Sequence, residues 1–268
     1  MSDLKDLTVL IRGAGDMASG VAHRLWQCHF KILATERAEP LCVRRAVSFS
    51  EAVHEGRATV EGVTARRIDS FGEAEAVWVA GELPVIVDPE MACLEEYKPA
   101  VLVEASLTKR NDFGLHAGLA PLVIALGPGF KAPQEADYVI ETNRGHNLGR
   151  VITLGQAEAD TGVPGDIAGY TQERLLRAPA DGVFETERRI GDLVEKGETV
   201  AQVDGQAVRA GVSGMIRGLI RPGMRVTAGL KIGDVDPRGE KAHPNLISEK
   251  ARAVAGAVLE CILRTYNI

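Results

Sequence analysis

The sequence is poor in several features that mark whole classes of protein. Aromatic residues make up only 4% of its 268 residues, which argues against a platform that stacks nucleic-acid bases. The net charge is −6 and no basic tract occurs, so we expect no partnership with nucleic acid. The sequence also lacks a signal-peptide pattern and any apolar run of the roughly 18 residues that cross a bilayer. We therefore expect a cytoplasmic protein that does not associate with membranes.

Cysteine is scarce as well. The four cysteines are scattered without CxxC spacing, so neither a disulfide framework nor a metal site is predicted. Cys28 and Cys261 lie at apolar-spaced positions of helix-like segments, which predicts core residues. Cys42 stands beside two arginines, which favour a thiolate. Whether a cysteine carries sulfur or selenium stays open at this stage.

What the sequence does contain is an alternation of strand-like and helix-like segments. LTVLIR (7–12) is followed by a glycine-rich turn, an amphipathic segment and a second apolar strand, KILATE (31–36). Further short apolar runs occur at 84–88, 100–105 and 121–126, as is typical of strands buried on both faces of a parallel sheet. We predict an α/β fold with a Rossmann-like parallel-sheet domain over residues 1–150.

The turn GAGDMA resembles the phosphate-binding turn of dinucleotide-binding proteins. Gly13 would permit the tight turn, and Gly15 would let the backbone approach a phosphate. Glu36, at the end of the second strand, is placed to accept a ribose hydroxyl. Asp16, in the first helical turn, belongs to the same set of candidate cofactor-binding residues, although its carboxylate would repel a pyrophosphate. A purely structural turn therefore remains the alternative to a bound nucleotide.

In parallel sheets, ligands bind beyond the carboxyl ends of the strands, and this rule nominates residues in later loops. Arg44 and Arg45 are candidates for phosphate contacts, with a solvated loop as the alternative. Gly127 and Gly129 in LGPGF follow an apolar strand. Lys109 in EASLTKRN follows another, which makes it a candidate catalytic residue.

The polar stretch ETNRGHNLGR (141–150) is the other candidate site. Asn143, Arg144 and Asn147 could hold a ligand through amide and guanidinium groups, and His146 is a second candidate catalytic residue. We predict that Arg144, His146 and Asn147 line a cleft between the two halves of the chain. The alternative is a tight turn in which the arginines pair with nearby acids.

The C-terminal half contains an internal repeat. Residues 176–203 align with 208–235 without gaps, and three pairs of glycines stay in step. The two repeats resemble the halves of a biotinyl/lipoyl-like β-sandwich, in which a lysine on the hairpin between the halves carries the cofactor. The hairpin VDGQAV (203–208) has no lysine, so neither biotin nor lipoate is expected.

The predicted domains follow from these boundaries. Residues 151–169 connect the first domain to the β-sandwich, or barrel-sandwich hybrid, at 170–238. Residues 239–268 form a final helix that packs back on the chain or on a second subunit, which leaves a homo-oligomer open.

Taken together, several long motifs resemble the YqeB family. They are IRGAGDMASGVAHRL, the run at 39–53, EASLTKRN, ALGPGF, ETNRGHNLGR, and RAPADGVF with LKIGDVDPRG. That family is described as an accessory protein of the selenium-dependent molybdenum hydroxylase system. The resemblance implies a maturation protein with a molybdenum hydroxylase as its partner, binding a nucleotide or a molybdenum–pterin cofactor.

Two other functions stay open, an NAD-dependent oxidoreductase and a non-catalytic scaffold. The chain has no Tyr-x-x-x-Lys pattern, which weighs against the first, and the polar stretch at 141–150 weighs against the second. Whether the protein is an enzyme is not decided by its sequence.

Overall fold

The structure is a computed structural model that describes residues 4–267, and the chain divides into two compact units. Unit 1 comprises Met1–Pro40, Ser48–Thr161 and Ile247–Ile268. Unit 2 comprises Leu41–Val47 and Gly162–Leu246. This division differs from the predicted boundaries, because a short early segment belongs with the C-terminal repeats and the last helix belongs with the N-terminal half. Among the described residues, no helix is long and apolar enough to cross a membrane.

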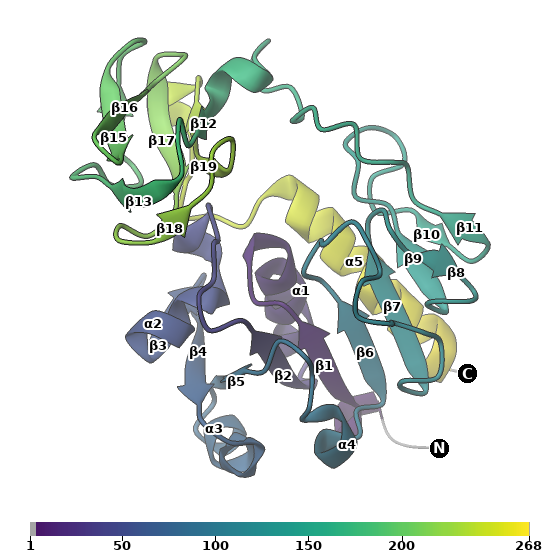
Figure 1. Ribbon diagram of the computed structural model, residues 1–268. Coiled ribbons are helices and arrows are strands. Elements are labelled where there is room, and N and C mark those ends of the chain that lie inside the picture. Colours follow the sequence, from purple (N-terminus) through teal and green to yellow (C-terminus); the bar gives the residue numbers. More distant parts are fainter. Residues whose placement is uncertain (1–3, 268) are drawn as a thin grey trace. The chain divides into compact units, whose positions relative to one another are not determined.

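Unit 1 is built on a nine-stranded sheet with the order β10-β9-β7-β6-β1-β2-β5-β4-β3 (Figure 1). Seven neighbouring strands, from β9 to β4, run parallel, and only the edge strands β10 and β3 are antiparallel. The strands of this sheet are β1 Thr8–Arg12, β2 Lys31–Glu36, β3 Arg57–Val60, β4 Val63–Ile68, β5 Leu83–Val87, β6 Val101–Glu104, β7 Leu122–Leu126, β9 Tyr138–Ile140 and β10 Val151–Ile152.

Short elements fill in the rest of unit 1. Strands β8 and β11 form a two-stranded sheet of their own. These strands and the helices of the unit are β8 Lys131–Ala132, β11 Gly155–Gln156, α1 Asp16–Gln27, α2 Ala52–Glu55, α3 Ala74–Val79, α4 Leu94–Tyr97 and α5 Glu249–Tyr266, with 3-10 turns η1 Leu4–Asp6, η3 Phe49–Glu51 and η4 Phe71–Glu73.

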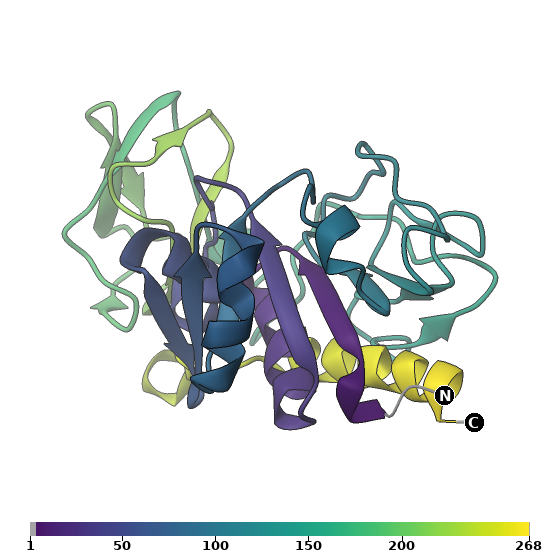
Figure 2. The ribbon, with the colours of Figure 1, turned by 90° about the horizontal axis from the view of Figure 1, so that it is seen from below.

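The central strands are buried because helices cover both faces of the sheet, as Figure 2 shows. Side chains alternate between the faces of a strand, so Leu10 and Leu102 point to one face. That face packs on residues of α3 and α4, including Val77 and Tyr97, in one hydrophobic cluster. Helices α1 and α5 contact each other and lie on the sheet, α5 against β7 and β9. The near-continuous apolar runs of the sequence reflect this double burial.

Helices α1 and α5 pack closely because small residues face each other. A Cβ on Gly20 would lie 2.8 Å from Cβ of Ala251, so glycine allows the helices to approach. Helix α5 begins with Ser248 as N-cap, whose side chain accepts a hydrogen bond from Ala251 N. Near its end, Tyr266 donates a hydrogen bond to Ala100 O, just before β6. Helix α5 therefore runs from the carboxyl edge of the sheet to its amino edge.

The turn between β3 and β4 is also attached to α5. Glu61 and Gly62 both have positive φ angles, as a two-residue hairpin requires. The Glu61 carboxylate accepts hydrogen bonds from Ile247 N and the Arg252 guanidinium, which outweigh the effect of burial and lower its pKa.

Unit 2 consists of two four-stranded antiparallel sheets, with orders β12-β19-β17-β14 and β16-β15-β13-β18. Its elements are η2 Arg45–Val47, η5 Gln172–Arg174, β12 Leu175–Arg177, β13 Gly182–Glu185, β14 Leu193–Val194, β15 Thr199–Val203, β16 Gln206–Arg209, β17 Gly214–Leu219, β18 Arg225–Val226, β19 Lys231–Asp236 and η6 Gly239–Lys241. Side chains from both sheets, including Phe184 and Ile216, form a single core.

The internal repeat is visible in this topology. Each repeat supplies four strands, β12 to β15 and β16 to β19, and each sheet takes strands from both repeats in equivalent positions. The matched glycines also have matched backbone angles. Gly182 and Gly214 have φ of 159° and 158°, and Gly191 and Gly223 have φ of 104° and 85°. The two repeats are therefore duplicated in conformation as well as in sequence.

A short segment from the N-terminal half completes unit 2. Leu219 N donates a hydrogen bond of 2.7 Å to Val43 O, and Arg45 Nε donates one of 2.8 Å to Leu219 O. These bonds attach residues 41–47 to β17. The assignment of unit 1 as Rossmann-like and of unit 2 as biotinyl/lipoyl-like remains a proposal, which these two topologies support.

Candidate functional site

The carboxyl edge of the sheet of unit 1 contains most of the predicted site residues. Strand β2 follows β1 on one side of it, whereas β6 lies on the other side, so the direction of strand addition reverses between β1 and β6. Ligands of open parallel sheets bind at such a switch point. The residues that follow β1 and β6 are therefore the first to consider.

The glycine-rich turn lies directly at this switch point. Gly13 has φ of 100° and its N–H donates to Thr35 O. A Cβ at Gly13 would lie 3.1 Å from backbone atoms of Ser106, which follows β6. Gly15 is the N-cap of α1 and its helix has no side-chain cap there. The backbone of the two loops is thus in direct contact.

Carboxylates at the ends of four strands hold the loops that follow them. Glu36 accepts hydrogen bonds from Ala14 N at 2.9 Å and from Arg37 N at 2.8 Å. Asp88, after β5, accepts bonds from Ala92 N and Cys93 N. Glu36 was predicted to bind a ribose. Each of its oxygens accepts one backbone N–H group of the chain itself, and ribose binding stays a prediction.

Glu104 is the most buried of these carboxylates. It accepts hydrogen bonds from Ser106 N and from the Ser106 hydroxyl, and Arg12 donates to it at 3.0 Å. The Arg12 guanidinium also lies 3.8 Å from the ring centre of Phe113. Burial raises the pKa of Glu104, and the bonds from Ser106 and Arg12 act in the opposite direction. This cluster fixes the backbone beside Gly13.

Glycine is required at two further places on this edge. A Cβ on Gly129, whose φ is 101°, would lie 2.6 Å from Arg110 N in the loop after β6. A Cβ on Gly127 would lie 2.7 Å from Oγ1 of Thr142. The loops after β6, β7 and β9 are therefore packed against one another, which brings Lys109, Gly127 and Gly129 into one region.

The stretch 141–150 is a hairpin loop between β9 and β10, and not a linker between the two units. Gly149 N donates to Glu141 O, and Glu141 N donates to Arg150 O, which closes the loop. A Cβ on Gly149 would lie 3.1 Å from Ala253 O, so the loop lies against α5. The whole loop belongs to unit 1. The predicted cleft between the halves is untested by these contacts and stays a prediction.

Both asparagines of this loop are bound to one carboxylate. Asn143 and Asn147 donate side-chain hydrogen bonds of 2.7 and 3.2 Å to Glu158, and these bonds lower its pKa. Buried Glu141 accepts hydrogen bonds from Asn143 N and Glu158 N. A pocket of about 340 Å³ opens beside this network, lined in part by Glu141, Asn147, Arg150 and Glu158.

The charged candidates of this edge are in ion pairs. Arg144 pairs with Glu249 at the start of α5. Lys109, which has φ of 65°, pairs with Asp160 at 2.7 Å. His146 is exposed, and the residues that line the pocket do not include it. The two candidate catalytic residues are thus brought to the same edge without a shared hydrogen-bond network.

One residue that the sequence did not single out also lies here, Lys250 in the first turn of α5. Its side chain is half-buried, and the carboxylates of Asp16 and Glu141 lie near enough to act on its charge. Burial lowers its pKa and the charge of Arg144 lowers it further, while Asp16 and Glu141 act in the opposite direction. The only sequence signal was its place two residues after the N-cap of an amphipathic helix.

Arg44 and Arg45 belong to unit 2, whereas the other candidate site residues belong to unit 1. Arg44 is buried and donates hydrogen bonds to Pro244 O and Leu246 O. Arg45 donates to Leu219 O. These contacts give both side chains a structural role within unit 2, and phosphate binding by either stays a prediction.

The cysteines differ in part from expectation. Cys261 is buried, as expected, and burial raises its pKa to about 12. Cys28 is exposed and the prediction of a core position was wrong, because α1 ends at Gln27 and Cys28 is its C-cap. No group of three or more metal-ligating side chains occurs in the part of the chain that the structure describes.

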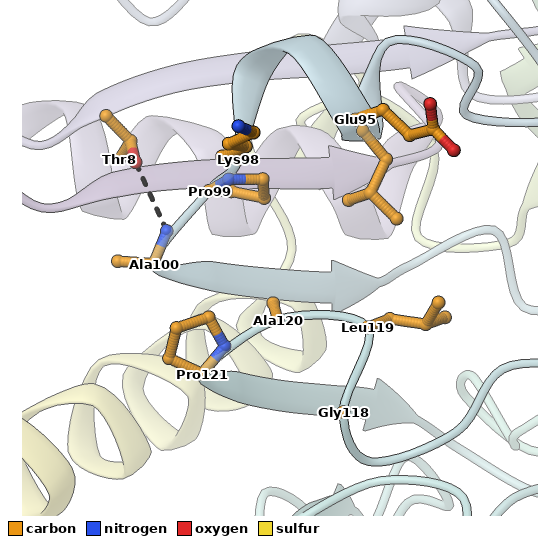
Figure 3. A pocket seen from close by; sticks show the side chains of 10 residues that line it. Thr8, Glu95, Lys98, Pro99, Ala100, Gly118, Leu119, Ala120 and Pro121 are labelled. Carbon is orange, nitrogen blue, oxygen red and sulfur yellow. Dashed lines mark hydrogen bonds between the residues drawn. The ribbon is translucent and has the colours of Figure 1, made fainter.

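Another pocket, larger than the one beside Glu158, lies at the opposite, amino edge of the sheet. It has a volume of about 970 Å³ and is lined by residues at the starts of β1, β6 and β7, including Thr8, Ala100 and Pro121 (Figure 3). Thr8 accepts a hydrogen bond from Ala100 N there. This pocket contains none of the predicted residues, and its lining is mainly apolar apart from Thr8, Glu95 and Lys98.

Similarity to known proteins gives a second line of observation on this chain. No family model matches it. It is 49% identical, over 255 residues, to a protein of Escherichia coli strain K12 named "Uncharacterized protein YqeB". The match covers 95% of this chain and 47% of that protein, so the chain spans about half the length of its relative. The resemblance to YqeB found in the motifs is confirmed as homology over almost the whole chain.

Among solved structures, two matches have low similarity. An aspartoacylase family protein from Mesorhizobium loti is 14% identical with a TM-score of 0.28, covering 86% of this chain and 85% of that one. The ectoine utilization protein EutE (DoeB) from Ruegeria pomeroyi is 12% identical with a TM-score of 0.26, at 86% and 85% coverage. Likeness at this level establishes neither a shared fold nor a shared activity.

Proposed function

We propose that this homologue of YqeB is an accessory protein that matures selenium-dependent molybdenum hydroxylases, and that it binds a phosphorylated ligand at the carboxyl edge of unit 1. The ligand classes are a nucleotide and a molybdenum–pterin cofactor. The hydroxylase role rests on the family resemblance of the motifs. The ligand site rests on the structure of unit 1 alone.

One observation carries the ligand site. The turn Gly13–Gly15 lies at the switch point between β1 and β6, and it opens a helix that has no side-chain cap. Backbone N–H groups at such a helix start favour a phosphate. The close approach of Gly13 to the backbone of Ser106 supports a turn whose position is set by the neighbouring loop, as expected of a preformed ligand site.

The surroundings of the site residues also bear on the two alternative functions, an NAD-dependent oxidoreductase and a non-catalytic scaffold. An NAD-dependent oxidoreductase would use an acidic residue after β2 for the ribose. Glu36 already holds two backbone N–H groups, which weakens that alternative. The polar loop 141–150, with the pocket lined by Glu141, Asn147, Arg150 and Glu158 beside it, weakens the alternative of a non-catalytic scaffold.

The ligand part of the proposal is tested by thermal unfolding with NAD, NADP, ATP, GTP and a molybdopterin-type ligand. A ligand at 100 times its Kd stabilises the folded state by about 2.7 kcal/mol, which raises the melting temperature by several degrees. Gly13→Ala should reduce this rise, because the added Cβ meets Ser106. Gly62→Ala is the matched control, since Gly62 also has positive φ but has open space around it.

The maturation part is tested in cells that make a selenium-dependent molybdenum hydroxylase. Without this protein, the purified hydroxylase should contain less molybdenum, pterin or selenium per chain. An unchanged content of all three would remove the proposed role. Equal melting temperatures with and without every ligand would remove the proposed ligand site.

A further inference from the structure

The pocket of about 340 Å³ beside the loop 141–150 has two side chains of opposite charge in its wall. Arg150 and Glu158 both line it, and Asn147 lines it as well. All three residues belong to unit 1. The volume is at the lower end of the roughly 300–1,000 Å³ that is typical of small-molecule sites. None of the residues that line this pocket belongs to the turn Gly13–Gly15, so it is a separate place on the molecule.

The carboxylate of Glu158 is held in place by neutral groups. Its Oε2 accepts a hydrogen bond of 2.7 Å from the Asn143 amide, and its Oε1 accepts one of 3.2 Å from the Asn147 amide. These bonds lower the pKa of Glu158, and no charged group contributes to the shift. Within residues 4–267, no cation forms an ion pair with Glu158. Each oxygen can accept one more hydrogen bond, so the group can still bind a cation.

Arg150 stands in the opposite electrostatic position. Its backbone is fixed, because its N–H donates to Asn147 O and its carbonyl accepts from Glu141 N. Its guanidinium makes one side-chain hydrogen bond, of 3.4 Å to Asn147 Oδ1. Over the described part of the chain, it has no ion pair with a carboxylate. A guanidinium has five N–H donors in a planar fork that matches a carboxylate, so Arg150 can bind one in a ligand.

The amide of Asn147 sets the spacing between these two charges. Its Oδ1 accepts from Arg150 Nη1 and its Nδ2 donates to Glu158 Oε1. The two hydrogen bonds and the amide group limit the separation of Nη1 and Oε1 to about 9 Å. An α-amino acid that forms one charge-assisted hydrogen bond at its carboxylate and one at its ammonium spans about 8 Å. The spacing therefore suits a ligand whose two charges lie on adjacent groups.

The rest of the wall includes apolar side chains. Leu154 is 81% exposed, and half-buried Val151 and Ile152 line the pocket with it. Pockets for small molecules combine such apolar surface with a few polar groups that fix the orientation of the ligand. These three residues offer a surface to an apolar ligand side chain.

We propose that this pocket binds a free α-amino acid with an apolar side chain, whose carboxylate contacts Arg150 and whose ammonium contacts Glu158. Buried Glu141 supports the arrangement, because its carboxylate accepts hydrogen bonds from the backbone N–H groups of Asn143 and Glu158. This inference goes beyond the proposed phosphorylated ligand and does not depend on it.

The first experiment is calorimetric titration of the protein with L-leucine, L-isoleucine and L-methionine at pH 7 and low salt. Two analogues of leucine each lack one charge, leucinamide the carboxylate and isocaproate the ammonium. Each should bind roughly ten- to a hundredfold more weakly than leucine, the effect of losing one charge-assisted hydrogen bond. This comparison uses only the wild-type protein.

Two variants assign the charges to their partners. Glu158→Gln should weaken the binding of leucine by a similar factor and leave that of isocaproate unchanged, because isocaproate has no ammonium. Arg150→Gln should weaken leucine and leave leucinamide unchanged. Both side chains are exposed, so the variants should keep the wild-type melting temperature. Glu95→Gln is the matched control, since Glu95 lines the pocket at the opposite edge together with a cation, Lys98.

Three results would overturn the inference. They are no binding of any of the three amino acids, equal affinity for leucine and isocaproate, and unchanged leucine affinity in Glu158→Gln and Arg150→Gln. None of them affects the proposed phosphate site, which is tested separately with nucleotides and Gly13→Ala.

Discussion

Single glycines decide how the loops of unit 1 meet. Gly129 has φ of 101°, and an added Cβ would collide with the backbone at Lys109 and Arg110. Backbone cannot move aside as a flexible side chain can. We expect Gly129→Ala to lower the free energy of unfolding by about 2–4 kcal/mol, from strained φ and overpacking together. Urea unfolding followed by circular dichroism measures the loss.

The variant Gly114→Ala separates the cost of the strained φ angle from the cost of overpacking. Gly114 also has positive φ, 76°, but nothing lies within 4 Å of the added Cβ. It should lose only about 1 kcal/mol, the cost of the backbone conformation. Equal losses in the two variants would show that contact with the loop after β6 does not restrict Gly129.

Lys250 should make stability depend on pH in an alkaline range. Burial lowers its pKa in the folded state below the usual value near 10.4. Between the two values the unfolded chain binds more protons, so stability should rise as the pH increases. Below the folded pKa the penalty for the buried charge is fully present. The Lys250→Met protein should lack this rise of the unfolding free energy with pH.

The measurement is urea unfolding at a series of pH values from 8 to about 10.5 for wild type, Lys250→Met and Lys98→Met. The difference between wild type and Lys250→Met should shrink as the pH rises, and Lys98→Met should follow the wild type. Parallel curves for all three proteins would mean that the surroundings of Lys250 do not destabilise its charged form.

At the scale of elements, the contact between α1 and α5 depends on small residues. Gly20→Ala places a methyl group 2.8 Å from Cβ of Ala251, so the helices must separate or shift. We expect a loss of about 1–3 kcal/mol in the free energy of unfolding. Thermal and urea unfolding both report it.

Gly256→Ala is the control on the same pair of helices. Gly256 lies within α5 and nothing would lie within 4 Å of its added Cβ. Since alanine is the better helix former, this variant should gain up to about 1 kcal/mol. A stabilised Gly20→Ala protein would show that the helices are not in close contact.

Strand-end carboxylates are a second feature at this scale. Glu36, Asp88, Glu104 and Glu141 each follow or end a strand and accept backbone N–H bonds from the next loop. Such hydrogen bonds offset the free-energy cost of removing the carboxylate from water, and they fix the conformation of the loop. An acidic residue after a parallel strand is therefore not by itself evidence for a ligand.

At the scale of the whole molecule, neither unit is a continuous piece of the chain. Unit 1 needs residues 247–268, which form α5, and unit 2 needs residues 41–47. A protein truncated after Thr161 would leave the faces of α1, β7 and β9 that α5 covers exposed to water. We expect this truncated protein to unfold or aggregate, as judged by circular dichroism and gel filtration.

A deletion within the chain provides the control. Replacing residues 162–246 with a flexible Gly/Ser linker keeps α5 in unit 1 and should restore cooperative unfolding. Stable, cooperative folding of the protein truncated at Thr161 would contradict the assignment of α5 to the core of unit 1.

Much of the fold was determined by local sequence. The apolar runs that predicted strands correspond to β1, β2, β5, β6 and β7, since strands covered on both faces must be apolar at nearly every position. The 32-residue repeat predicted equivalent turns, and Gly182 and Gly214 have almost the same φ. Backbone geometry that only glycine adopts readily leaves a mark in sequence that can be found without a structure.

Only the tertiary structure decided the partners of the charged residues. Sequence alone did not distinguish Arg44, which binds carbonyls of unit 2, from Arg144, which binds α5. It also gave no reason to consider Lys250, because its neighbours come from loops far away in the chain. Residue type states which bonds a side chain can form, whereas packing of distant elements determines which of those bonds are already made and which remain available to a ligand.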